Sequence, residues 1–86
     1  MKNYKIVLTK RFHKDFKKLP KEIQKKSKEK IRRLATGDFS FPSLRVKKMA
    51  GEENIWEASV TMNYRIIFQL EEKIIFLKIG THDILG

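Results

Sequence analysis

The chain has 86 residues, which is enough for one small domain with a modest hydrophobic core, so residues 1–86 are treated as a single domain. It contains no cysteine, and this excludes a disulfide framework and cysteine-based metal sites. Twenty Lys and Arg against ten Asp and Glu give a net charge of +10, which favours nucleic acid, an acidic membrane surface or an acidic protein as partner. Neither an apolar signal segment nor a run of ~18 apolar residues is found, so we predict a cytoplasmic protein.

The first half of the chain predicts one strand and two helices. Residues 4–9, YKIVLT, are apolar and β-branched and indicate a strand. Apolar residues then recur at helical spacing over residues 10–19 and again over 21–36. Thr9 is the expected N-cap of the first helix, and Pro20 separates the two helices. We therefore predict an N-terminal strand followed by a two-helix hairpin.

Positive charge is concentrated on the predicted helices. Residues 10–33 contain twelve Lys and Arg and three acids. Lysine-rich helix exteriors are common, so a solvated surface explains any single lysine. The excess as a whole favours an anionic partner, because like charges on neighbouring helical turns repel one another.

The second half of the chain predicts a sheet. Residues 44–49, LRVKKM, alternate apolar with basic side chains and predict a half-buried strand with a cationic outer face. Residues 55–61, 64–70 and 74–79 predict three more strands, whose short links favour antiparallel pairing. The class is then α+β, with the N-terminal strand and the two-helix hairpin packed on one face of a twisted antiparallel sheet. In the loop before these strands, Phe39 and Phe41 either cover the edge of the core or form an aromatic platform for a base.

Strand alternation separates two faces of the predicted sheet. The face that we expect the helices to cover bears Trp56, Tyr64, Ile66 and Phe68. Arg65 lies on the opposite face, together with Glu57 and Ser59 of the neighbouring strand. This second face is polar and of mixed charge, which suits a functional site.

The residue types present favour one kind of chemistry. The two histidines, His13 and His82, lack metal-ligand spacing, so we predict neither a metal nor another cofactor. RNA cleavage through the substrate's own 2′-hydroxyl needs only a cation for the phosphate and acid–base help. Arg65 suits the first role because guanidinium binds phosphate in a planar, bidentate way, and His82 suits the second because histidine changes charge near neutral pH. The structural alternatives are an Arg65–Glu57 pair across the sheet and a histidine that only forms part of a turn.

The order of strand, helix hairpin and sheet resembles the RelE/ParE superfamily of bacterial toxin–antitoxin toxins. The most specific parts of the likeness are Trp56, the strand Tyr-Arg-Ile-Ile-Phe at 64–68 and Gly-Thr-His at 80–82. The last motif looks most like the YafQ branch, and the spacing from Trp56 to Arg65 is similar to that of the YoeB branch. The resemblance implies a toxin whose ribosome-dependent relatives cut mRNA without a metal. It also implies a cognate acidic antitoxin that holds the toxin inactive.

The resemblance also implies roles for individual residues. Arg65 matches the strand arginine that contacts the scissile phosphate, and His82 matches the histidine proposed as general acid. Glu57 and Ser59 stand where RelE has lysines. Basic assistance then comes from Lys47 and Lys48, or Glu57 acts as a carboxylate base, as in the YoeB branch. Binding of the RNA backbone is predicted for Arg45, Lys47, Lys48 and Lys78. Antitoxin binding is predicted for Ile74 and Phe76, which are expected to face outward on the last strand.

The expected partners are therefore the antitoxin, mRNA and the ribosome, with neither a membrane nor a small-molecule cofactor. Two other functions remain open on the same fold. One is a ParE-like inhibitor of DNA gyrase, which needs no acid–base histidine. The other is a basic RNA-binding module without catalysis. Fold alone does not separate these functions.

Overall fold

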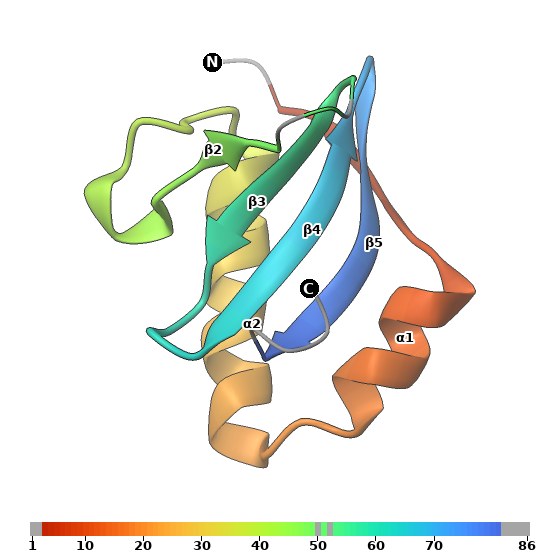
Figure 1. Ribbon diagram of the computed structural model, residues 1–86, viewed down its shortest axis with the longest axis vertical. Coiled ribbons are helices and arrows are strands. Elements are labelled where there is room, and N and C mark those ends of the chain that lie inside the picture. Colours follow the sequence, from red (N-terminus) through yellow and green to blue (C-terminus); the bar gives the residue numbers. More distant parts are fainter. Residues whose placement is uncertain (1–2, 50, 52, 82–86) are drawn as a thin grey trace.

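The computed structural model describes residues 3–49, 51 and 53–81. Its elements in chain order are β1 (Lys5–Leu8), α1 (Lys10–Lys17), α2 (Lys21–Ala35), the 3-10 helix η1 (Pro42–Leu44), β2 (Lys47–Lys48), β3 (Ile55–Ser59), β4 (Tyr64–Leu70) and β5 (Lys73–Thr81). The described strands form a five-stranded sheet in the order β1-β5-β4-β3-β2 (Figure 1). β1 runs parallel to β5, whereas the other neighbours are antiparallel. The predicted α+β class is confirmed, and the sheet is mixed because β1 joins it beside the last strand.

Side-chain hydrogen bonds tie the ends of the helices to the sheet and to each other. Thr9 is the N-cap of α1, as predicted: its Oγ1 accepts from the amide of Phe12 at 3.2 Å and donates to the carbonyl of Phe76 at 2.8 Å. One hydroxyl therefore satisfies a helix terminus and links α1 to β5. In the next helix, Gln24 Nε2 donates to the carbonyl of Phe16 at 3.1 Å and so joins α2 to α1.

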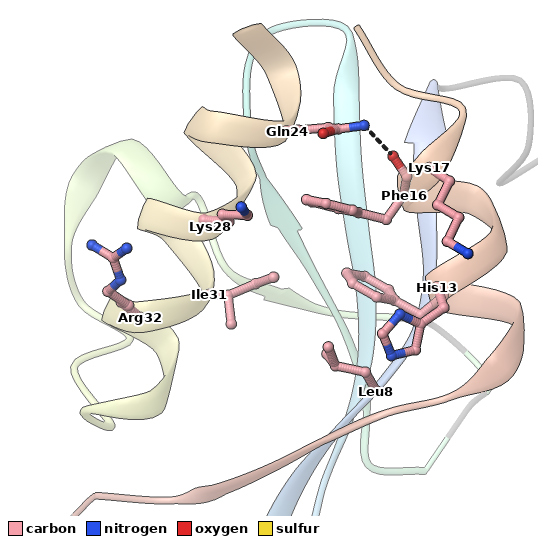
Figure 2. Close-up of a pocket in the computed structure, with 9 residues that line it drawn as sticks. Leu8, His13, Phe16, Lys17, Gln24, Lys28, Ile31 and Arg32 are labelled. Atoms are coloured by element: carbon pink, nitrogen blue, oxygen red, sulfur yellow. Dashed lines mark hydrogen bonds between the residues drawn. The ribbon is translucent and has the colours of Figure 1, made fainter. Parts of the chain in front are cut away.

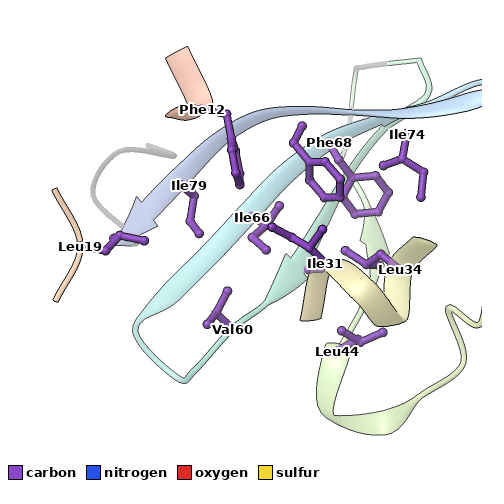
Figure 3. Close-up of a cluster of buried hydrophobic side chains, with 12 residues drawn as sticks. Phe12, Leu19, Ile31, Leu34, Leu44, Val60, Ile66, Phe68, Ile74 and Ile79 are labelled. Atoms are coloured by element: carbon purple, nitrogen blue, oxygen red, sulfur yellow. The ribbon is translucent and has the colours of Figure 1, made fainter. Parts of the chain in front are cut away.

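The hydrophobic core lies between the sheet and the two helices (Figure 3). Its centre is a run of three aromatic rings: Phe76 packs against Phe12 with ring centroids 5.5 Å apart and against Phe68 at 6.1 Å. The full cluster of buried apolar residues is Phe12, Leu19, Ile31, Leu34, Leu44, Ala58, Val60, Ile66, Phe68, Ile74, Phe76 and Ile79. No helix in the described part of the chain combines the length and apolar character needed to cross a membrane.

The strand predicted over residues 44–49 is wrong for most of its length, since β2 is only Lys47–Lys48. Pro42 begins η1 instead, and this short helix buries Leu44 completely. Proline favours the first turn of a helix because its φ angle is already helical. Arg45 follows in the left-handed region, with φ 45° and ψ 50°. Alternation of apolar and basic residues does not reveal this turn.

The outward orientation predicted for Ile74 and Phe76 is also wrong. Both side chains are 0% exposed. They lie on the face of β5 that the helices cover, where Phe76 meets Phe12 of α1. Alternation identifies the residues that share a face of a strand, but only packing decides which face is covered. In this structure the two residues belong to the core and offer no surface to a partner.

Candidate functional site

Arg65 lies on the face of the sheet opposite the core, as predicted, and its partner on β3 is Ser59. Its side chain is only 11% exposed. Nη1 donates to the carbonyl oxygens of Thr61 at 2.6 Å and Met62 at 2.7 Å, both in the turn between β3 and β4. The guanidinium is therefore held in one orientation by backbone acceptors that cannot move without opening the hairpin.

Glu57 lies between two cations on the same face. Its Oε1 is 3.4 Å from Nε of Arg65 and 3.9 Å from Nζ of Lys47. The Glu57 side chain is 12% exposed, whereas that of Lys47 is 70% exposed. The cross-sheet pair of Arg65 with Glu57, one of the structural alternatives that the sequence left open, is thus present. It also places a carboxylate beside the cation for which a phosphate contact is predicted.

Strand register locates the other predicted RNA-binding residues. Lys47 pairs with Glu57, Glu57 with Ile67, and Ile67 with Lys78, so these four form one row across the sheet. Directly opposed residues point to the same side, so Lys47 and Lys78 share the face of Arg65. Lys48 pairs instead with Trp56, whose side chain packs against the core. Lys48 therefore points to the side of the sheet away from Arg65.

A hollow of about 300 Å³ opens beside Arg65, and three cations line it: Lys30, Arg45 and Arg65. The rest of its wall is residues 59–62, at the end of β3 and in the following turn. The sequence does not single out Lys30, because nothing in its local spacing distinguishes it from the other lysines of α2. Only the packing of α2 behind the sheet brings it near Arg65.

His82, the predicted general acid, and its neighbour Asp83 lie outside the described residues. The last described residue, Thr81, pairs with Tyr64 across β4 and β5, and Gly80 pairs with Arg65. Within residues 3–49, 51 and 53–81, no three His, Asp or Glu side chains are grouped closely enough to hold a metal ion.

A second feature is a groove of about 540 Å³ between α1 and α2 (Figure 2). The helices follow each other as predicted, but this groove separates them. Its apolar lining is Leu8, Phe12, Phe16 and Ile31, and its polar and charged lining is His13, Lys17, Gln24, Lys28 and Arg32. An apolar hollow therefore lies between the helices, and not on the last strand, where an exposed apolar surface was predicted.

The model of the ParE toxin family of type II toxin–antitoxin systems (parDE) matches residues 6–85. The chain therefore belongs to this family, within the RelE/ParE superfamily, and is the toxin component of a toxin–antitoxin system. Comparison with curated proteins finds no match.

Solved structures of similar fold come from several microorganisms. A chain of the RelB–RelE antitoxin–toxin complex from Methanococcus jannaschii is 26% identical, with a TM-score of 0.77 over 92% of this chain and 93% of that chain. A chain of the E. coli DinJ–YafQ complex is 23% identical, with a TM-score of 0.84 over 95% and 97%. A metal-bound toxin from Helicobacter pylori is 17% identical, with a TM-score of 0.78 over 96% and 99%. The last two show likeness of fold alone.

Proposed function

We propose that this toxin inhibits translation by cutting mRNA on the ribosome. The observation that carries the proposal is the oriented Arg65 guanidinium, with Glu57 at 3.4 Å and Lys47 and Lys78 on the same face. A basic protein of this kind is attracted to RNA, and the ribosome holds its mRNA in a defined geometry.

Arg65 would stabilise the charge that develops on the phosphate oxygens during cleavage. Its described contacts use Nε, toward Glu57, and Nη1, toward the turn carbonyls. We assign Nη2 to the contact with a phosphate oxygen. Because the turn already orients the guanidinium, little reorganisation is needed in the transition state, and this is the condition under which electrostatic stabilisation is most effective.

Glu57 and His82 would transfer the protons. The 2′-oxygen attacks the phosphorus while Glu57 accepts the hydroxyl proton, and the bond to the 5′-oxygen breaks as His82 protonates that oxygen. The products are a 2′,3′-cyclic phosphate and a 5′-hydroxyl. His82 follows Gly80 by two residues, a reach of at most about 7 Å along the chain, and Gly80 pairs with Arg65. Chain connectivity thus supports the assignment of His82 to this site.

The test adds purified toxin to translating ribosomes and maps the mRNA ends by primer extension. We expect codon-phased cuts that fall roughly 100- to 1,000-fold in Arg65→Lys, which keeps the charge but loses the planar fork. His82→Gln should lower the rate by roughly 100-fold. The matched control is Lys25→Gln, which removes an exposed cation of α2 and should leave cutting unchanged. Thermal unfolding of each variant separates loss of activity from loss of fold.

The match to the ParE family model favours a second candidate, inhibition of DNA gyrase. That activity needs no general acid, so His82→Gln should not affect it. The same protein preparations therefore go into a gyrase supercoiling assay. Inhibited supercoiling with intact mRNA would replace the nuclease proposal by the gyrase proposal. If the mRNA stays intact and supercoiling is normal, both proposals fail, and a basic RNA-binding module without catalysis is the remaining function.

We propose further that an acidic antitoxin binds the groove between α1 and α2. The groove offers apolar walls, and the cations Lys17, Lys28 and Arg32 along it complement acidic side chains (Figure 2). Phe16→Glu places a charge in the groove and should abolish co-purification with the protein encoded by the adjacent gene. Val7→Glu, on the exposed edge strand, is the control and should leave co-purification intact. Loss in both variants, or in neither, would contradict this location.

A further inference from the structure

Lys30 of α2 lines two neighbouring hollows. One is the hollow beside Arg65 described above, of about 300 Å³. The other, of about 440 Å³, is lined by Glu29, Lys30, Arg32, Arg33 and Phe41. The two hollows share Lys30, and we call the cations and the aromatic ring that line them the α2 track: Lys30, Arg32, Arg33, Phe41, Arg45 and Arg65.

The α2 track passes around the edge of the sheet. In the described part of the chain, β2 reaches β3 only at Glu57 and Trp56. The end of β3 beyond these residues is therefore not covered by β2, and the hollow lined by residues 59–62 lies there. The lining residues therefore extend from Arg65 of β4, past residues 59–62 at the end of β3, to Lys30, Arg32 and Arg33 of α2.

The charge of the α2 track is one-sided. The two hollows together are lined by five Lys and Arg side chains and one acid, Glu29. Arg45 has a left-handed backbone conformation, which costs free energy for any residue other than glycine. Arg45 is the C-cap of η1, so the turn that ends this short helix also places a cation at the hollow.

An oriented guanidinium lies at the far end of the α2 track. The guanidinium carbon of Arg33 is 3.8 Å from the centroid of the Phe41 ring, and Phe41 is itself packed against the core. One face of the guanidinium is thus backed by the ring, which limits its rotation. A planar group of this kind stacks well on a nucleobase, as arginine side chains do in the recognition of single-stranded RNA. A surface of solvated lysines would not provide an oriented planar group like the Arg33 guanidinium.

We propose that the α2 track binds the single-stranded RNA that flanks the cleavage site. Phosphates would lie on Lys30, Arg32 and Arg45, and a base would stack on the Arg33–Phe41 pair. The inference rests on the proposed function, in that RNA is the ligand. It adds to that function the path that the RNA strand follows on either side of the phosphate bound at Arg65.

The experiment measures fluorescence anisotropy of a fluorescein-labelled, 2′-O-methylated 12-nucleotide RNA, which binds but cannot be cut. Titrations at 50 to 200 mM KCl give the affinity and its salt dependence. Lys30→Gln should weaken binding and reduce the slope of log K against log salt by about 0.7, the value for one phosphate contact with a single strand. Lys25→Gln removes the same charge from α2 at a residue outside the two hollows and should change neither quantity.

Arg33→Lys tests the stacked base separately, because it keeps the charge and removes the plane. We expect the salt slope to stay unchanged and the affinity to fall roughly fivefold or more. Equal weakening by Lys25→Gln and Lys30→Gln would mean that only the overall charge attracts RNA, and the inference would be overturned. Wild-type affinity in Lys30→Gln and Arg33→Lys, with mRNA cutting still lost in Arg65→Lys, would overturn the α2 track and leave the proposed function standing. If the toxin inhibits gyrase and does not bind the RNA, both fail.

Discussion

The two faces of β4 are both shielded from water, but by different means. On one face Phe68 is 0% exposed and packs against the rings of Phe39 and Phe76. On the other face the side chain of Arg65 is 11% exposed and is surrounded by a carboxylate and by turn carbonyls. Apolar packing stabilises the first face. On the second face, low exposure strengthens each polar contact and keeps a cation oriented.

The largest effect on stability is expected when a side chain is removed from the apolar core. Phe76→Ala removes the ring between Phe12 and Phe68 and should lower the free energy of unfolding by about 3–5 kcal/mol. Small domains have only about 5–15 kcal/mol in total, so much of the stability is lost. Urea titration measures the change. Met62→Ala, at a side chain 81% exposed, is the control and should change stability by less than about 0.5 kcal/mol. A loss at Phe76 as small as at Met62 would show that β5 does not face the helices.

A smaller effect is expected on the polar face. Glu57→Gln keeps the shape of the side chain but removes the charge that faces Arg65. The free energy of unfolding should fall by about 1–3 kcal/mol, because the shielded Arg65 cation loses its ion-pair partner. Urea titration at neutral pH provides the measurement. If stability is unchanged, the turn carbonyls alone hold Arg65, and Glu57 has no structural role.

The smallest effect is expected for the outer cation of the same carboxylate. Lys47→Gln should cost about 0–1 kcal/mol, because Nζ is 3.9 Å from Glu57 and the side chain is 70% exposed. Comparison with Glu57→Gln by the same titration separates the shielded pair from the exposed one. Equal losses in the two variants would mean that Lys47, rather than Arg65, is the main partner of Glu57.

Much of the fold and part of the candidate site could be predicted from the sequence. The helical spacing of apolar residues located α1 and α2, and Thr9 was recognised as a cap. Period-two alternation located β4 and separated Arg65 from Phe68. These features depend on neighbours within a few residues. The short η1 escaped prediction because the apolar–basic alternation of residues 44–49 is also typical of a strand. The orientation of β5 escaped it because that orientation depends on the position of α1.

The sequence by itself determined the charge, the two helices, the alternation of the strands and the likeness to a toxin family, since all of these are properties of local spacing and residue type. Only the tertiary structure decided which face of β5 is buried, that Glu57 lies between Lys47 and Arg65, and that Lys30 approaches the same hollow as Arg45. The physical reason is that contacts between residues distant in the chain form when helices and sheet bury a common core. That packing sets the strand register and the positions of the side chains on the face opposite the core.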